Sequence, residues 1–208
     1  MQRTLQRLSL MTLVIITVMV GCAYVPTQEM SDARQAIKAA REVKAVSYVP
    51  THLAVAEQSL TTAEHYLEVG QFNQARLNAK LATEQAVDAY KMTVAITRAK
   101  TMEQSLTAIG YSAPTVNKLL EQAMASAQQQ EVDKTITLAN EAYHQGELLL
   151  NQAQLEQARL MISKISTQLT DLTQNELRIL KLAQIAYRRY QGRKAYNLII
   201  KLYNQLFD

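Results

Sequence analysis

Residues 50–96 read PTHLAVAEQSLTTAEHYLEVGQFNQARLNAKLATEQAVDAYKMTVAI, and this stretch decides the fold. Its apolar residues recur at spacings of three and four, which places them on one face of a helix. A first stripe begins at Leu53 and stops before Gly70, and a second stripe, almost all alanine, runs from Phe72 to Ile96. Because successive alanines let two backbones approach closely, we predict an antiparallel helical hairpin.

The whole chain has the composition of a helical protein. Its 208 residues include five glycines, three prolines and no tryptophan, with long runs of Ala, Gln, Leu, Glu and Lys, which are good helix formers. A further helix is predicted to begin with a cap at Ser31 and to end near Ser47, because Pro50 disfavours helical geometry at Val49. The predicted fold is therefore all-α, an elongated bundle of long antiparallel helical hairpins.

A second copy of the Pro-Thr helix start follows the first at an interval of 64 residues. The coincident pairs are Arg34 and Arg98, Pro50 and Pro114, Thr51 and Thr115, Glu57 and Glu121, Gln58 and Gln122, and Ala63 and Ala127. After one deletion, Glu68-Val69 matches Glu131-Val132, Asp133 replaces the glycine turn, and a long helix is predicted from near Val132. We interpret this pattern as a degenerate internal repeat, with chance matching of helical sequence as the alternative.

The N-terminal segment has the organisation of an export signal. Arg3 and Arg7 precede an apolar stretch with no acidic residue. The sequence from Met19 to Gly21 and Cys22 resembles the lipobox of bacterial lipoproteins, which predicts cleavage after Gly21 and acylation of Cys22. One alternative is an uncleaved anchor, although the apolar stretch is shorter than the roughly 20 residues that span a bilayer. The other is ordinary secretion, which would leave an unpaired thiol.

This interpretation sets the expected organisation of the chain. The predicted segments are a signal peptide (1–21), a tether (22–30), a first helical repeat unit (31–109), a second unit with a long helix (110–170) and a basic helical hairpin (171–208). Cleavage removes two arginines and lowers the formal net charge from +4 to +2. Several acyl chains on Cys22 would attach the protein stably to a membrane. Ala23, in place of the aspartate that retains lipoproteins in the inner membrane, favours the periplasmic face of the outer membrane.

The basic hairpin, residues 171–208, is the only strongly charged segment. It holds seven basic residues, three acidic residues and four tyrosines. It is predicted to bind an acidic partner, such as lipid head groups, lipopolysaccharide phosphates or an envelope protein, through Tyr187, Arg188, Arg189, Tyr190, Arg193 and Lys194. A solvated face with partly buried tyrosines is the alternative, and export argues against a nucleic-acid partner.

No catalytic motif is recognisable. His52, His65 and His144 lack the spacing of metal ligands, and the chain contains no HExxH, CxxC, nucleophile elbow or phosphate-binding loop. Acids brought together by folding, such as Glu57 and Glu121, are left open. We expect no enzyme activity, no metal and no cofactor apart from the lipid on Cys22, and we expect the histidines to lie on polar faces or in turns.

The run from Asp32 to Glu42, DARQAIKAARE, carries a family resemblance together with the positions that follow it: Pro50, Ala56-Glu57, Leu60, Ala63-Glu64, Gly70 and Ala75-Arg76. Over Met30 to Lys91 the chain resembles the uncharacterised lipoprotein domain of Gram-negative envelopes that often precedes an OmpA-like peptidoglycan-binding domain. The resemblance implies tetratricopeptide-like helical hairpins with a groove for a peptide or helix. No OmpA-like segment follows, so direct anchoring to the cell wall is not expected.

Two functions follow as expectations. The first is a non-enzymatic helical adaptor that is lipid-anchored in the envelope and binds another envelope protein. The second is a self-associating structural lipoprotein whose alanine and leucine seams pair between chains as a coiled-coil-like homo-oligomer.

Overall fold

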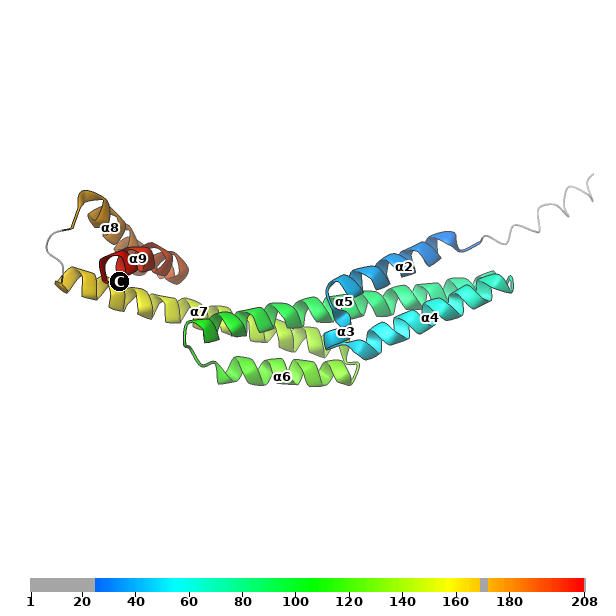
Figure 1. The fold of residues 1–208 in the computed structure, drawn as a ribbon. Helices are drawn as coiled ribbons and strands as arrows, with labels where there is room; N and C mark the ends of the chain where they lie inside the picture. Colours follow the sequence, from blue (N-terminus) through cyan, green and yellow to red (C-terminus); the bar gives the residue numbers. More distant parts are fainter. Residues whose placement is uncertain (1–24, 169–171, 208) are drawn as a thin grey trace, which may run out of the picture. The chain divides into compact units, whose positions relative to one another are not determined.

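The computed structural model describes residues 25–168 and 172–207, and this part of the chain is all-α, as predicted. Its helices, shown in Figure 1, are α2 (Thr27–Glu42), α3 (Ala45–Tyr48), α4 (Pro50–Glu68), α5 (Phe72–Ala108), α6 (Pro114–Gln128), α7 (Val132–Gln168), α8 (Gln174–Arg188) and α9 (Gly192–Phe207). None of these helices combines the length and the apolar character that crossing a membrane requires.

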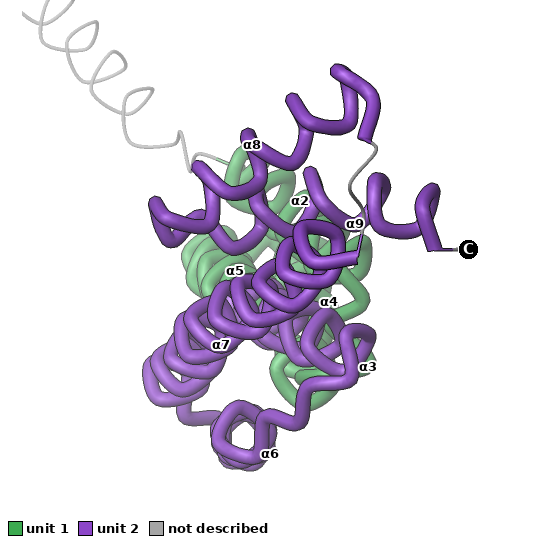
Figure 2. The backbone as a smooth tube through the Cα atoms, turned by 90° about the vertical axis from the view of Figure 1, so that its left-hand side faces the viewer, with its two compact units in different colours: residues 1–90 green, residues 91–208 purple. Residues whose placement is uncertain are grey.

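The chain divides into two compact units, residues 1–90 and residues 91–208, coloured separately in Figure 2. The division falls within α5, so the beginning of this long helix belongs to the first unit and its end to the second. Each unit has its own buried residues and is described separately below.

In the first unit, α4 and α5 form the predicted hairpin, and α2 packs against it. One hydrophobic cluster joins Met30 and Ala33 of α2, Ala63 of α4 and Ala79 and Ala82 of α5. The alanine seam of α5 is fully buried at Ala75, Ala79, Ala82, Ala86 and Ala89. These alanines are therefore buried by contacts within the chain. The self-association hypothesis required them to be exposed for pairing between chains.

The boundaries predicted for the first helix were wrong at both ends. The helix α2 begins at Thr27 rather than Ser31, because Met30 is buried in the core and Glu29 lies 2.9 Å from Arg76 of α5. Residues 27–30 of the predicted tether are thus helical. The helix ends before Ser47, since Lys44 takes a left-handed conformation with φ +64° and begins the separate short helix α3.

In the second unit, the 37-residue helix α7 contacts all the later helices. Figure 2 shows α6 on one side of α7 and α8 with α9 on another. The core of the C-terminal hairpin joins Ala158 and Ile165 of α7 to residues of α8 and α9, namely Leu180, Ala183, Ala186, Ala195, Ile199 and Leu202. Helices α8 and α9 thus form a hairpin that packs against the end of α7.

Three turns of one geometry connect α4 to α5, α6 to α7 and α8 to α9. Gly70, Gln130 and Tyr190 follow one another at intervals of 60 residues, and each has a positive φ. The next residue in each turn donates its N–H five residues back: Gln71 to Tyr66 (2.8 Å), Glu131 to Ser126 (3.0 Å) and Gln191 to Ala186 (3.0 Å). This is the Schellman closure of a helix C-terminus. The hairpin therefore occurs three times.

The register predicted for the internal repeat needs correction. Helix α6 has 15 residues and α4 has 19, so α6 is about one turn shorter although both begin at proline. At the turn, Ala63 therefore corresponds to Ala123 rather than Ala127, and the glycine position is taken by Gln130 rather than Asp133. The two copies therefore differ by about one turn of helix, rather than by the deletion of a single residue.

Gly146 marks a close approach of α5 and α7 within the second unit. It is buried in the middle of α7, and a Cβ placed on it would collide with Cγ of Met102 and lie 3.7 Å from Leu106 Cδ1. The glycine corresponds to Ala86 of the first hairpin at the same interval of 60 residues. A residue with no side chain is needed here because a methionine fills the space that a methyl group would occupy.

We expect Gly146→Ala to lower the free energy of unfolding by about 1–3 kcal/mol through overpacking. Helix propensity alone would change stability by about 1 kcal/mol in the opposite direction, so the sign of the effect reports the contact. Urea denaturation followed by circular dichroism gives the measurement, with the exposed neighbour substitution Gln145→Ala as control. In a Met102→Ala background the same glycine substitution should become stabilising, and a loss of the same size in both backgrounds would contradict the proposed contact.

Candidate functional site

A pocket of about 600 Å³ lies in the second unit. We call it the tyrosine pocket, and its lining residues are Tyr111, Gln152, Ala153, Leu155, Glu156, Tyr187, Arg188 and Tyr190. Helix α7 supplies the central four, the turn after α5 supplies Tyr111, the C-terminal end of α8 supplies Tyr187 and Arg188, and the turn after α8 supplies Tyr190. Ligand pockets typically combine apolar or aromatic walls with a few polar groups, as this one does.

Two side-chain amides of α7 hold the turns that carry the tyrosines. Asn151 Oδ1 accepts a hydrogen bond from the Gly192 N–H (2.9 Å), and Asn151 Nδ2 donates to the Tyr190 carbonyl (3.4 Å). Gln157 Nε2 donates to the Ile109 carbonyl (3.2 Å) in the turn that leads to Tyr111. Both turns are therefore fixed to α7, one beside each end of the pocket-lining segment.

Gly192 is required for the first of these contacts. A Cβ at this position would collide with the backbone carbonyl oxygen of Asn151 and lie 2.7 Å from its Oδ1. A backbone neighbour cannot move aside as a flexible side chain can. Glycine therefore allows α9 to begin directly against α7, where its first N–H reaches Asn151.

Tyr190 has a backbone conformation that does not suit its residue type. Its φ is +55° and its side chain is 80% exposed. A left-handed conformation costs an L-residue roughly 1–2 kcal/mol, and the equivalent position of the first hairpin is Gly70. Because little of this ring is buried, packing within the chain does not explain why a tyrosine occupies this position. Strain of this kind concentrates at functional sites, which supports a binding role for the pocket.

Two charged residues line the tyrosine pocket, and only one of them, Glu156, is paired with an opposite charge within the described part of the chain. Arg159 donates to both carboxylate oxygens of Glu156, at 2.6 Å and 3.0 Å. These hydrogen bonds hold the pKa of Glu156 below its usual range, so the carboxylate stays ionised and paired. Arg188 is exposed and makes no ion pair within the described part of the chain. It is therefore the uncompensated charge of the lining.

The structure divides the predicted binding residues of the basic hairpin. Tyr187, Arg188 and Tyr190 line the tyrosine pocket. Arg193 and Lys194 lie on the first turn of α9 and are exposed, and Arg193 lines a different pocket. Arg189 is exposed and lines neither pocket. The six predicted residues therefore do not all line one pocket.

Three lining residues were not predicted from the sequence: Tyr111, Gln152 and Glu156. They lie on other helices and turns, and no spacing along the chain connects them with the C-terminal tyrosines. Tyr111 carried a weak signal, because it directly follows Gly110, whose φ of +73° ends α5 as Gly70 ends α4. A residue just after such a turn is well placed to line a surface beside the next helix.

The lipidation residues Gly21 and Cys22 lie outside the described residues. Among the described residues, no group of three or more histidines, cysteines and carboxylates could hold a metal ion. His65 and His144 are exposed, as expected, but the prediction for His52 was wrong: it is only 3% exposed. Burial lowers the pKa of His52, an effect that Asp88 opposes.

The two acids left open by the sequence lie in different units. Glu57 Oε1 lies 2.8 Å from Arg41 Nη2, so this carboxylate joins α4 to α2. Glu121 is exposed on α6 in the second unit. Neither residue lines the tyrosine pocket.

One family comparison bears on the chain. Residues 28–109 match the family described as a domain of unknown function (DUF4398). An uncharacterised DUF4398 domain thus occupies this part of the chain. The resemblance predicted for Met30 to Lys91 is confirmed at the level of an uncharacterised domain. The tyrosine pocket lies wholly after the DUF4398 match, so the family assigns it no role.

Neither a curated protein nor a solved structure matched the chain. The tetratricopeptide likeness therefore stays a prediction. The inference of function rests on the geometry of the site and on the sequence motifs.

We expect Tyr190→Gly to raise the free energy of unfolding by about 1 kcal/mol, because glycine adopts a positive φ without steric cost. Gln130→Gly, at the equivalent turn of the second hairpin, should give a gain of similar size and serves as the matched control. Urea denaturation measures both. A loss of stability in Tyr190→Gly alone would show that the tyrosine ring contributes to folding, which would contradict its assignment to binding.

Proposed function

We propose that this chain is a non-enzymatic, lipid-anchored envelope lipoprotein that acts as a helical adaptor and holds a second envelope protein at the tyrosine pocket. The observation that carries the proposal is the pocket itself, in particular the exposed, strained Tyr190 beside the unpaired Arg188. Tyrosine and arginine are the residues most enriched, with tryptophan, among those that dominate binding energy at protein interfaces.

Several features support a binding role over a catalytic one. The pocket-lining carboxylate, Glu156, is neutralised by Arg159 and its pKa is lowered, whereas a general acid needs a raised pKa. The lining contains no histidine, serine or cysteine. Tyrosine rings give a partner a large contact area at a low cost in side-chain entropy, which suits recognition of a protein surface.

The membrane part of the proposal rests on the motif around Cys22. Acylation there would place the described helices beside the membrane surface, with only a few residues between the lipid and Thr27, where α2 begins. Ala23 favours the outer membrane, with the helices facing the periplasm. The partner is then a protein of the periplasm or the envelope, and nucleic acid is not expected.

We expect Cys22→Ser to move the protein from the membrane fraction to the soluble fraction of cells, because the acyl chains provide the attachment. Ala23→Ser is the matched control and should stay in the membrane fraction. Fractionation and immunoblotting give the measurement, and circular dichroism should show unchanged helix content. A Cys22→Ser protein that remains fully membrane-bound would support the uncleaved anchor instead.

We expect a photo-crosslinking phenylalanine at position 190 to form an adduct with one envelope protein in living cells, identified by mass spectrometry. The same residue at Tyr90, which is 40% exposed on α5 and outside the pocket, is the positional control. Arg188→Glu should lower the adduct yield about tenfold or more, since a charged hydrogen bond is lost and a repulsion is added.

The neighbouring substitution Arg189→Glu provides a matched control for Arg188→Glu. It introduces the same charge on the next residue, which does not line the pocket, and should leave the yield within about twofold of the unsubstituted chain. Equal loss from both substitutions would indicate attraction by net charge rather than binding at the pocket. No adduct from position 190 would contradict the adaptor proposal.

A further inference from the structure

A second pocket in the second unit, of about 520 Å³, has a different chemistry. We call it the arginine pocket, and it is bordered by Arg98 of α5, Arg193 of α9, Tyr143 of α7 and hydroxyl-bearing residues of α5. On α7 it borders Leu150 and Gln154, whereas the tyrosine pocket borders Gln152 and Glu156. Because two residues along a helix correspond to a rotation of about 200°, the two pockets lie on opposite sides of α7.

The arginine pocket is positively charged. Both arginines are exposed, neither forms an ion pair within the described residues, and the lining includes no acidic side chain. The guanidinium carbon of Arg98 lies 4.4 Å from the centroid of the Tyr143 ring. Stacking of this kind restrains the guanidinium while leaving its N–H groups able to bind an anion.

Two hydroxyl groups of the pocket can act only as acceptors toward a ligand. Thr101 Oγ1 donates to the Thr97 carbonyl (2.9 Å), and Ser105 Oγ donates to the Thr101 carbonyl (2.8 Å). Since each hydroxyl has one hydrogen, the remaining lone pairs can only accept. A ligand that fits this lining brings hydroxyl or N–H donors in addition to its negative charge.

The remaining lining is apolar. Met102, Ile109 and Leu150 border the same pocket and are each partly buried. An anion bound by the arginines would therefore lie beside a surface that favours hydrocarbon. The lining combines cationic, acceptor and apolar groups.

We infer that the arginine pocket binds a phosphate ester that carries hydroxyl groups and an apolar chain. Phosphate groups accept strong, charge-assisted hydrogen bonds from guanidinium groups, and two arginines border this pocket. An anionic glycerophospholipid and a soluble sugar or glycerol phosphate share this head-group chemistry. The inference is independent of the proposed adaptor function, because it uses other residues and the other side of α7.

The test uses the full chain in nanodiscs of neutral phosphatidylcholine and isothermal titration calorimetry, with empty nanodiscs as the blank. The probes are hexanoyl lysophosphatidylglycerol, its zwitterionic counterpart hexanoyl lysophosphatidylcholine, and glycerol 3-phosphate. We expect the first probe to bind about tenfold or more tightly than the second, because only the first has a net negative charge for the arginines. Glycerol 3-phosphate binding as tightly as the first probe would contradict the role given to the apolar chain and would identify a soluble phosphate ester as the ligand.

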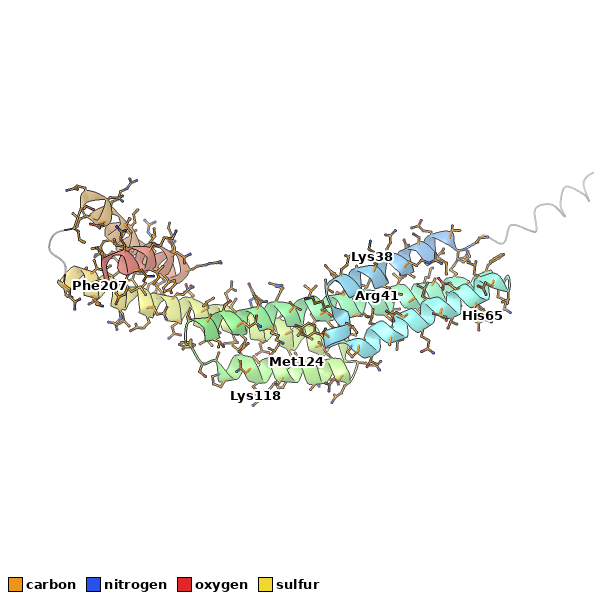
Figure 3. The ribbon with its side chains drawn as sticks, in the orientation of Figure 1. Lys38, Arg41, His65, Lys118, Met124 and Phe207 are labelled. Atoms are coloured by element: carbon orange, nitrogen blue, oxygen red, sulfur yellow. The ribbon has the colours of Figure 1, made fainter. Side chains whose placement is uncertain are left out.

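Three substitutions connect any binding to the pocket. Arg98→Gln and Arg193→Gln should each weaken the binding about tenfold or more. Arg193 lies in the first turn of α9 and, in the part of the chain that the structure describes, does not stack on an aromatic ring. Weaker binding in Arg193→Gln therefore reports a lost contact with the anion rather than a loss of folding. The control is Lys118→Gln, at a residue that Figure 3 shows on the side of α6 away from α7.

Two results would overturn the inference. One is that the unsubstituted chain binds neither hexanoyl lysophosphatidylglycerol nor glycerol 3-phosphate. The other is that binding is unchanged in both arginine variants. Arg188→Glu should leave phosphate binding intact, and Arg98→Gln should leave the adduct from position 190 intact. Failure of the arginine pocket and failure of the adaptor proposal therefore give different patterns.

Discussion

The close approach of helix backbones along small residues is the constraint on which both units depend. In the first unit the seam consists of fully buried alanines of α5, and in the second the closest approaches need Gly146 and Gly192. Small side chains bring backbones together, but they bury little apolar area per residue. The hairpins are consequently thin, and long polar and aromatic side chains lie near the surface rather than in a deep core. This is why the larger hollows of the second unit form beside α7, where turns from different hairpins meet it.

The three Schellman turns that close the hairpins share one geometry but have different residues at the position of positive φ. The first turn has Gly70, which adopts a positive φ without strain. The second has Gln130, which is strained and does not line the tyrosine pocket. The third has Tyr190, which is strained and whose exposed ring lines that pocket. Folding alone would favour glycine at all three positions. Tyr190 differs from Gln130 in that its exposed ring lines a pocket, and this difference supports the proposed binding role.

The sequence predicted well what depends on short-range periodicity. The helical class, the glycine turn at Gly70, the helix from Val132 and the C-terminal hairpin each follow from spacing and helix-breaking residues. The C-terminal hairpin was not recognised as a third copy of the first, because its turn has Tyr190 at the position that glycine occupies in the first turn. The start of α2 was missed because Glu29 and Met30 are made helical by contacts with α5 and the core, which no local pattern contains. The tyrosine pocket could be predicted only in part, since the amides of Asn151 and Gln157 bring together turns that are far apart in the chain.

Those two amides connect folding to both pockets. The turn held by Gln157 contributes Ile109 to the arginine pocket and Tyr111 to the tyrosine pocket, and the turn held by Asn151 lies between Tyr190 on one side and Arg193 on the other. A hydrogen bond of this kind contributes about 1 kcal/mol to stability, a small part of the total. Its larger effect is geometric, because a turn released from α7 would displace a residue of each pocket at once. The second unit is thus built so that two chemically different surfaces depend on the same pair of contacts along one helix.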